Sequence, residues 1–297
     1  MKQVIFALLI LLTNLGAVRG ETNDVRITDV AFTAACDGTE QRYVLQMPAG
    51  FKPGQSHDLL IALHGHGSDR WQFVRDPRAE CRAARDMAAA HGMIYVSPDY
   101  RAKTSWMGPK AEADLVQIIG DLKKKYRVSR VFLCGGSMGG TASLTFAALH
   151  PKVVDGLAAM NGTANLVEYA GFPDAIAASF GGSKAAIPDE YKKRSAEFWP
   201  QSFTMPVGIT ASGKDSTVPP QSVVRLAHAL KARGRDVLLI YREEMGHSTS
   251  YEDARAIIEF IIQKARPGKA RQFLTPRTQR IAPSEGVVTL KSEKTYD

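Results

Sequence analysis

The stretch Val131-Phe132-Leu133-Cys134-Gly135-Gly136-Ser137-Met138-Gly139-Gly140 decides the fold. Its first four residues form a short apolar run, typical of a strand that is covered on both faces. The residues that follow, as far as Leu149, favour a helix that ends before Pro151. A G-x-S-x-G sequence between a strand and a helix predicts a nucleophile elbow, a tight turn that exposes a strained serine. A glycine-rich turn without chemical function is the alternative interpretation.

Five further apolar runs have the length and composition of buried strands. They lie at residues 59–63, 93–96, 157–160, 207–210 and 237–241. Apolar residues at helical spacing predict helices around residues 115–122, 223–230 and 250–261. Strands that alternate with helices indicate a mostly parallel central sheet with helices on both faces. The sequence therefore predicts an α/β fold, with one catalytic domain over residues 21–265.

The segment 161–203 interrupts this alternation, because it is longer than a plain connection between two strands. It contains Gly181-Gly182 and a polar, helix-like piece around residues 191–198. We expect a small flap or extra helices here, and no large lid domain.

Residues 1–20 have the three parts of a secretory signal peptide. Lys2 supplies a positive charge, residues 4–12 are an unbroken apolar run, and Val18-Arg19-Gly20 offers a cleavage site. The apolar run is too short for a permanent membrane anchor, and no later segment could span a bilayer. A retained amphipathic start is the alternative. We therefore expect a protein that is secreted or periplasmic.

The formal net charge is +8, and removal of residues 1–20 with Lys2 and Arg19 lowers it to +6. Part of the excess lies near a predicted basic tail, residues 266–297. The basic residues that lie close together there are Lys264, Arg266, Lys269, Arg271, Arg277 and Arg280. Such a tail could meet an anionic polysaccharide or lipid, or be solvated. Because no nucleic-acid motif accompanies it, we expect no nucleic-acid partner.

Three cysteines do not suit a disulfide scaffold, and their spacing shows no metal-binding motif. Cys134 ends the predicted strand before the elbow and is expected to be buried. Cys36 and Cys81 could pair in an oxidising compartment or remain free, because the sequence gives no distance between them.

A serine hydroxyl needs a general base to act as a nucleophile. Gly213-Lys214-Asp215 follows the run 207–210, and Gly246-His247 follows the run 237–241. Both side chains are therefore expected beyond the carboxyl ends of strands, the edge that also carries Ser137. The order serine, acid, histidine is the one found in the nucleophile-elbow fold.

Other acids and histidines compete for these roles. Glu243 and Glu244 are close enough in sequence to His247 to stay open as the acid, whereas Asp236 precedes its strand and lies at the opposite edge. The histidines that fall before strands or within helices are expected to be surface or packing residues. They are His57, His91, His150 and His228.

His64-Gly65-His66-Gly67-Ser68 follows the run 59–63 and is expected to supply part of an oxyanion hole. Backbone N–H groups stabilise the charge that acyl transfer builds on a carbonyl oxygen. We expect one donor at Met138 and the second at His66 or, as the alternative, at Gly67. Two histidines with one residue between them could instead bind zinc, but no third ligand accompanies them.

Four motifs together resemble the α/β-hydrolase superfamily. They are His64-Gly65, the 135–140 motif, Gly213-Lys214-Asp215 with Val218-Pro219, and Gly246-His247. The resemblance covers about residues 40–265, and dienelactone hydrolases in this superfamily use a cysteine where this chain has a serine. Within the superfamily the chain is similar to exported single-domain esterases and to prolyl-oligopeptidase-type catalytic domains. The latter likeness departs in one respect, because the sequence shows no propeller domain to gate peptides.

The resemblance implies that Ser137 attacks an ester or amide carbonyl. His247 would transfer the proton, and Asp215 would hold the imidazole in its productive tautomer. No metal and no organic cofactor is implied.

The resemblance favours a carbohydrate esterase that removes acetyl or feruloyl groups from polysaccharide. Trp106 follows the run 93–96 and could stack on a sugar or aromatic acyl group, or be buried by packing. Gly67 and Ser248 are further candidates for substrate contact. The alternatives are a peptidase that acts on short peptides and a non-catalytic carbohydrate-binding protein on the same fold. The sequence does not predict the oligomeric state.

Overall fold

The computed structural model describes residues 25–265 and 287–289. Its strands are β1 Ile27–Thr33, β2 Glu40–Gln46, β3 His57–Leu63, β4 Ile94–Pro98, β5 Val128–Gly136, β6 Gly156–Met160, β7 Val207–Ser212, β8 Val237–Arg242 and β9 Val287–Thr289. Its helices are α1 Gln72–Arg75, α2 Ala79–Ala90, α3 Pro109–Lys125, α4 Met138–Leu149, α5 Pro173–Phe180, α6 Pro188–Lys193, α7 Gln221–Ala232 and α8 Tyr251–Lys264. Two short 3-10 helices are η1 Ala196–Phe198 and η2 Pro200–Ser202.

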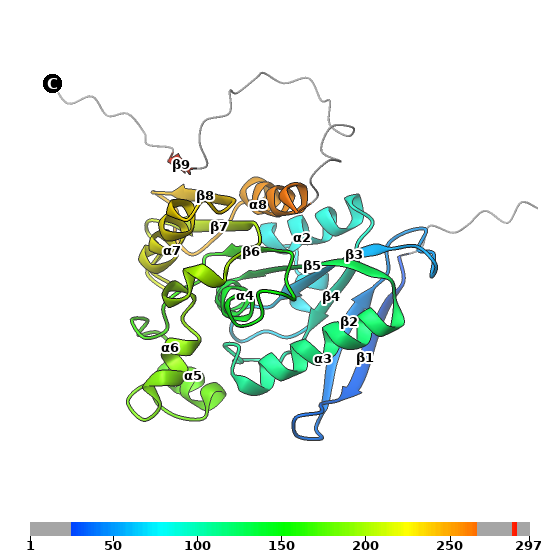
Figure 1. Ribbon diagram of the computed structural model, residues 1–297, viewed down its shortest axis with the longest axis horizontal. Helices are drawn as coiled ribbons and strands as arrows, with labels where there is room; N and C mark the ends of the chain where they lie inside the picture. Colours follow the sequence, from blue (N-terminus) through cyan, green and yellow to red (C-terminus); the bar gives the residue numbers. More distant parts are fainter. Residues whose placement is uncertain (1–24, 266–286, 290–297) are drawn as a thin grey trace, which may run out of the picture.

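The strands form one sheet in the order β1-β2-β4-β3-β5-β6-β7-β8-β9 (Figure 1). β1 pairs antiparallel with β2, and β2 pairs antiparallel with β4. All other neighbours run parallel, from β4 to β9. The mostly parallel sheet confirms the predicted fold class, and each of the six predicted strands is present.

Two of the strands that the sequence did not predict are β1, which forms the edge of the sheet, and β2, which joins it antiparallel to β4. β1 is largely exposed, so it lacks the continuous apolar run by which the buried strands were recognised. The third, β9, consists of only three residues that pair with β8 inside the segment expected to be a tail. The rest of that tail and the expected signal peptide lie outside the described residues.

Side chains alternate between the two faces of the sheet and form a separate apolar cluster on each. In β3, Leu59, Ile61 and Leu63 belong to the cluster beneath α3, α4 and α7. Leu60 and Ala62 belong to the cluster beneath α2 and α8. The helices lie correspondingly on opposite sides of the sheet in Figure 1. Burial on both faces is what the predicted two-sided covering requires.

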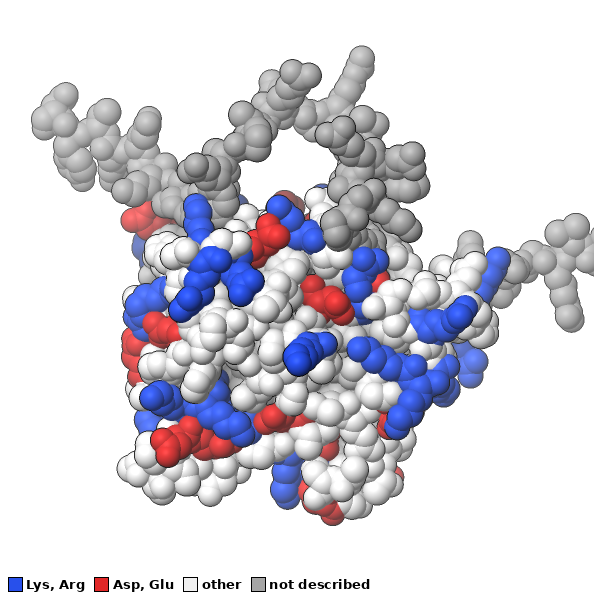
Figure 2. All heavy atoms as spheres, in the orientation of Figure 1, with Lys and Arg blue, Asp and Glu red and all other residues white. Residues whose placement is uncertain are grey.

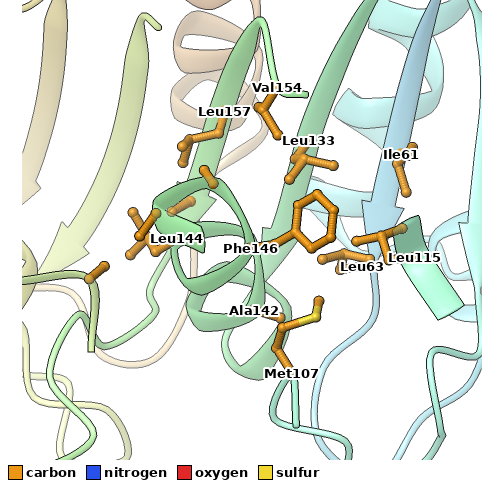
Figure 3. Close-up of a cluster of buried hydrophobic side chains, with 14 of the residues drawn as sticks. Ile61, Leu63, Met107, Leu115, Leu133, Ala142, Leu144, Phe146, Val154 and Leu157 are labelled. Atoms are coloured by element: carbon orange, nitrogen blue, oxygen red, sulfur yellow. The ribbon is translucent and has the colours of Figure 1, made fainter. Parts of the chain in front are cut away.

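The helix after the elbow, α4, is buried on nearly its whole circumference, and eleven of its twelve residues are buried. Figure 3 shows Phe146 of α4 pointing toward Leu133 of β5 and Leu63 of β3. A helix that is buried all round is held by its surroundings on every side. This fixes the start of α4, and with it the elbow, against the centre of the sheet.

The segment 161–203 contains α5, α6, η1 and η2. These short elements pack beside α3, α4 and α7 and add no second sheet or core of their own. Extra helices are therefore present where the sequence predicted a flap or extra helices.

All three cysteines are free thiols in the structure. Cys81 and Cys134 are buried in the cluster beneath α2 and α8. Cys36 is exposed and lies beside Asp114 and Arg101 instead. The pairing of Cys36 with Cys81, left open by the sequence, is therefore not made.

Lys and Arg side chains are interspersed with Asp and Glu on the face drawn in Figure 2. Arg70 bridges Asp29 and Asp99 at 2.9 Å each. Among the residues described, no helix is both long and apolar enough to span a bilayer.

Candidate active site

Ser137 occupies the turn between β5 and α4, with φ 57° and ψ −119°. This left-handed conformation is strained for a residue with a side chain. The glycines around it are required by close approach of other backbone segments. A Cβ on Gly139 would overlap the carbonyl oxygen of Leu63, and a Cβ on Gly140 would lie 2.8 Å from that of Met160. The predicted elbow geometry is therefore present.

Ser137, His247 and Asp215 are joined in series by two hydrogen bonds, with His247 in the middle. Ser137 Oγ lies 2.9 Å from His247 Nε2, and His247 Nδ1 lies 2.7 Å from Asp215 Oδ2. The three residues come from the turn after β5, the loop after β8 and the loop after β7. Because these strands are parallel, their carboxyl ends meet at one edge of the sheet.

The carboxylate of Asp215 is almost completely buried, with a side-chain exposure of 1%. Its second oxygen, Oδ1, accepts the backbone N–H groups of Thr217 and Val218 at 3.0 and 2.8 Å. The rival acids lie elsewhere: Glu244 is exposed and pairs with Lys214, and Glu243 is exposed on the same turn. The structure thus places Asp215, and neither glutamate, against His247.

A buried polar network holds the chain that follows His247. Asn161, at the end of β6, accepts a hydrogen bond from Thr249 and donates one to Ser212 at 2.9 Å. Ser212 in turn donates to the backbone carbonyl of Ser248 at 3.2 Å. Sequence reasoning missed Asn161, whose positive φ of 47° at a strand end gives no recognisable motif.

The loop from His64 to Ser68 lies beside the elbow, since a Cβ on Gly65 would be 3.6 Å from the Gly136 carbonyl. Most of its N–H groups are already bonded. That of Gly65 donates to Gln72 Oε1 at 2.7 Å, and that of Gly67 donates to the Lys103 carbonyl at 2.8 Å. Within residues 25–265, no acceptor is bonded to the backbone N–H of His66 or of Met138. This pattern favours His66 over Gly67 as the second oxyanion donor.

A cleft of about 270 Å³ opens beside Ser137. Its lining residues are Gly65, Gln72, Phe73, Arg78, Ala79, Glu80, Gly136, Ser137, Met160, Asn161, His247, Ser248 and Thr249. Ser248 thus borders the cleft, whereas Gly67 and Trp106 do not. His66 and Met138 each directly follow a lining residue without lining the cleft themselves.

Three polar side chains of the cleft were not anticipated from the sequence: Gln72, Arg78 and Glu80. They come from α1 and the start of α2, a region with no motif. Arg78 is paired with Asp76 at 2.7 Å. The carboxylate of Glu80 has no hydrogen-bond or ion-pair partner among the described residues. Only the folding of α2 over the elbow brings these groups to Ser137.

Trp106 is completely buried, so of the two roles that the sequence left open it has the packing role and not contact with a sugar or acyl group. It packs instead against Tyr169 and Phe172, with ring centroids 5.6 Å away in each case. Its indole N–H donates to Nδ1 of His66 at 3.2 Å. Phe172 is the partly exposed aromatic ring of this group, with 36% of its surface accessible.

Both ring nitrogens of His64 lie against backbone carbonyl oxygens, of Gly65 at 2.8 Å and of Asp99 at 3.1 Å. Burial lowers the pKa of His64. In the described part of the chain, no three or more His, Cys, Asp or Glu side chains are grouped so as to hold a metal ion. The structure therefore brings no third ligand to the pair His64 and His66.

A sequence model of the prolyl oligopeptidase family matches residues 81–265. No match was found among the curated proteins.

Solved structures that share the fold include peptidases and esterases. The chain is 15% identical to an acylaminoacyl peptidase from Pyrococcus horikoshii, with a TM-score of 0.63 over 81% of this chain and 42% of the peptidase. It is 14% identical to an S-formylglutathione hydrolase from Staphylococcus aureus, with a TM-score of 0.60 over 80% and 99% of the two chains. It is 16% identical to a ferulic acid esterase, with a TM-score of 0.62 over 80% and 98%. The chain spans less than half the length of the peptidases that it matches.

Proposed function

The chain belongs to the prolyl oligopeptidase family of α/β-hydrolases. We propose that within this family it is an exported esterase that releases acetyl or feruloyl groups from polysaccharide. Membership of this family makes it a serine hydrolase. The ester bond, the polysaccharide and export are the proposal.

The reaction follows from the hydrogen-bonded line at Ser137. His247 Nε2 accepts the proton of the Ser137 hydroxyl as the oxygen attacks the ester carbonyl. The imidazolium that forms is stabilised by Asp215, which also holds the proton on Nδ1. His247 then protonates the leaving alcohol, and water releases the acyl group by the same steps in reverse order.

The negative charge that develops on the carbonyl oxygen needs donors that are already in place. The unbonded backbone N–H groups of Met138 and His66 supply them in our proposal. Met138 is the first residue of α4, so its N–H also lies at the positive end of the helix dipole. The hydrogen bonds from Ser137 through His247 to Asp215 are the observation that supports hydrolysis through an acyl-enzyme on Ser137.

The lining of the cleft supports a hydroxyl-rich substrate. Gln72, Arg78 and Glu80 offer both donors and acceptors beside the nucleophile. Such alternation of donors and acceptors suits the neighbouring hydroxyl groups of a sugar. The exposed part of Phe172, which stacks on His66 at 4.1 Å between ring centroids, offers an aromatic surface for a feruloyl group. The similarity over nearly the whole length of a ferulic acid esterase agrees with an ester substrate.

Acetate release from acetylated xylan by the purified protein tests this function. We expect release by the wild type and a loss of at least about 10³-fold in Ser137→Ala. Normal release by Ser137→Ala would contradict the mechanism. Absence of release by the wild type would contradict the choice of an acetyl ester and place feruloyl esters first. Export is tested by sequencing the N-terminus of protein from the exported fraction, where a start at Met1 would contradict a cleaved signal peptide.

A peptidase is the second candidate function, because the family and the acylaminoacyl peptidase structure favour it. The two functions are separated by comparing kcat/KM for a peptide anilide and for a phenyl ester with the same acyl group. A preference for the anilide would replace the esterase by the peptidase and leave the roles of Ser137 and His247 unchanged.

A further inference from the structure

The buried side chain of Trp106 ends on the loop that carries His66, the second of the two proposed oxyanion donors. An indole has a single polar group, an N–H that can only donate. Nδ1 of His66, 3.2 Å away, must therefore accept and carries no proton. In a neutral imidazole the proton then sits on Nε2, so this contact selects one of the two tautomers of His66.

The surroundings of His66 agree with a neutral ring. It lies between Trp106 and Phe172, with ring centroids at 6.0 and 4.1 Å. Burial lowers the pKa of His66. Protonation of Nδ1 would also turn two N–H groups toward each other and leave the completely buried indole N–H without an acceptor.

The segment that carries Trp106 also holds the backbone on either side of His66. The Tyr100 hydroxyl donates to the His64 carbonyl at 2.5 Å, and the Lys103 carbonyl accepts the N–H of Gly67 at 2.8 Å. These contacts use groups before and after residue 66 and leave its own N–H unbonded. The indole is the contact made by this segment to the side chain of His66 itself.

The other side of this segment is anchored to the core. Arg194, completely buried, donates to the carbonyl of Met107 at 2.6 Å and pairs with Glu112 at 2.8 Å. Met107 directly follows Trp106 and is also completely buried. The backbone next to Trp106 is thus held by Arg194, and the hydrogen bond from the indole restricts the movement of the His66 ring in turn.

We propose that Trp106 is a positioning residue whose indole N–H holds His66 as the neutral tautomer protonated on Nε2. It thereby keeps the backbone N–H of His66 directed at the carbonyl oxygen that Ser137 attacks. This rests on the proposed hydrolase function, in which that N–H is an oxyanion donor. Small displacements of such a donor are costly, because the developing charge is sensitive to its distance.

The test compares Trp106→Phe, which keeps an aromatic ring but removes the N–H, with the wild type. We expect kcat on p-nitrophenyl acetate to fall about 10- to 100-fold with KM changed less than about twofold. A long-range proton–nitrogen NMR correlation of the His66 ring should show Nε2 protonated in the wild type and a mixture of tautomers in the variant. Unchanged kcat in a folded variant, or the same tautomer in both proteins, would overturn the proposal.

Trp199→Phe is the matched control, because that indole donates to the Lys192 carbonyl at 3.1 Å in a neighbouring segment and does not contact His66. It should keep both wild-type kcat and the wild-type spectrum. A second pair of variants remains informative if Trp106→Phe folds poorly: His66→Asn keeps an acceptor near the position of Nδ1, whereas His66→Leu does not. We expect His66→Asn to retain a higher kcat, and equal losses in the two would overturn the proposal. The NMR measurement does not depend on turnover. If the wild type had no hydrolase activity, the proposed function would be contradicted, but the spectrum would still show which tautomer of His66 is present.

Discussion

The two oxygens of Asp215 are divided between His247 and the backbone. Oδ2 lies 2.7 Å from His247 Nδ1, while Oδ1 accepts the N–H groups of Thr217 and Val218. The carboxylate therefore cannot rotate without breaking three hydrogen bonds. An acid held in this way fixes both the orientation and the tautomer of the imidazole.

Asp215→Asn should lower kcat on p-nitrophenyl acetate by about 10³- to 10⁴-fold with little change in the midpoint of thermal unfolding. An asparagine can still accept the two backbone N–H groups through Oδ1. Its NH₂ would then face His247 and force the proton onto Nε2, where it cannot accept from Ser137. Glu244→Gln is the control and should keep wild-type kcat; a comparable loss there would return the acid role to the rival glutamates.

Gly139→Ala should destabilise the protein by about 3 kcal/mol or more, because the added Cβ would overlap the Leu63 carbonyl oxygen. Gly120→Ala is the matched control, since a Cβ there meets nothing within 4 Å in the middle of α3. That change should instead stabilise by about 1 kcal/mol, the difference in helix propensity. Urea unfolding of both variants checks this, and equal effects would mean that the elbow tolerates a side chain at residue 139.

The low pKa of Glu112 predicts that part of the free energy of unfolding is lost at acid pH. Burial opposes ionisation of its carboxyl, but hydrogen bonds from His150 and Arg194, at 2.8 Å each, outweigh it and lower the pKa to about 2. Because the pKa of the folded state lies below that of the unfolded state, this stabilisation is complete above about pH 4.5 and is lost as the pH falls toward 2.

Glu112→Gln should therefore be less stable than the wild type by about 2 kcal/mol at neutral pH, with the difference shrinking between pH 4.5 and 2. Thermal unfolding at several pH values measures this. Asp121→Asn, which removes an exposed pair with Lys124, should cause a difference near zero at every pH. A constant difference for Glu112→Gln would contradict the assignment of its pKa.

Glu80→Gln should reduce activity on acetylated xylan more than activity on p-nitrophenyl acetate. The unpaired carboxylate borders the cleft, and its hydrogen bonds to sugar hydroxyl groups would weaken in the amide. We expect the ratio of the two kcat/KM values to fall about tenfold. A parallel loss on both esters would show that Glu80 acts on the reacting groups and not on the sugar.

The parts of the fold that were predicted are those that a short stretch of sequence identifies by its own composition. Each of the six predicted strands contains a continuous apolar run, and the alternation of these runs with amphipathic helices predicted the parallel sheet. β1 escaped prediction because it is a largely exposed edge strand, and β2 because its buried apolar run is only Tyr43, Val44 and Leu45.

Part of the candidate site was likewise predicted from residues that are close in the sequence, and part was not. The turn chemistry around Ser137, and the placement of Asp215 and His247 after strands, could be read from neighbouring residues. The choice of Asp215 over Glu243 and Glu244, the burial of Trp106, and the presence of Glu80 in the cleft could not. Those depend on contacts between residues far apart in the sequence.

By itself, the sequence determined the elbow, because the G-x-S-x-G motif, the strand before it and the helix after it are adjacent in the chain. Only the tertiary structure decided which N–H groups remain unbonded, which acid meets His247, and which side chains line the cleft. A hydrogen bond forms only between atoms about 3 Å apart, and strand order and loop paths alone set those distances.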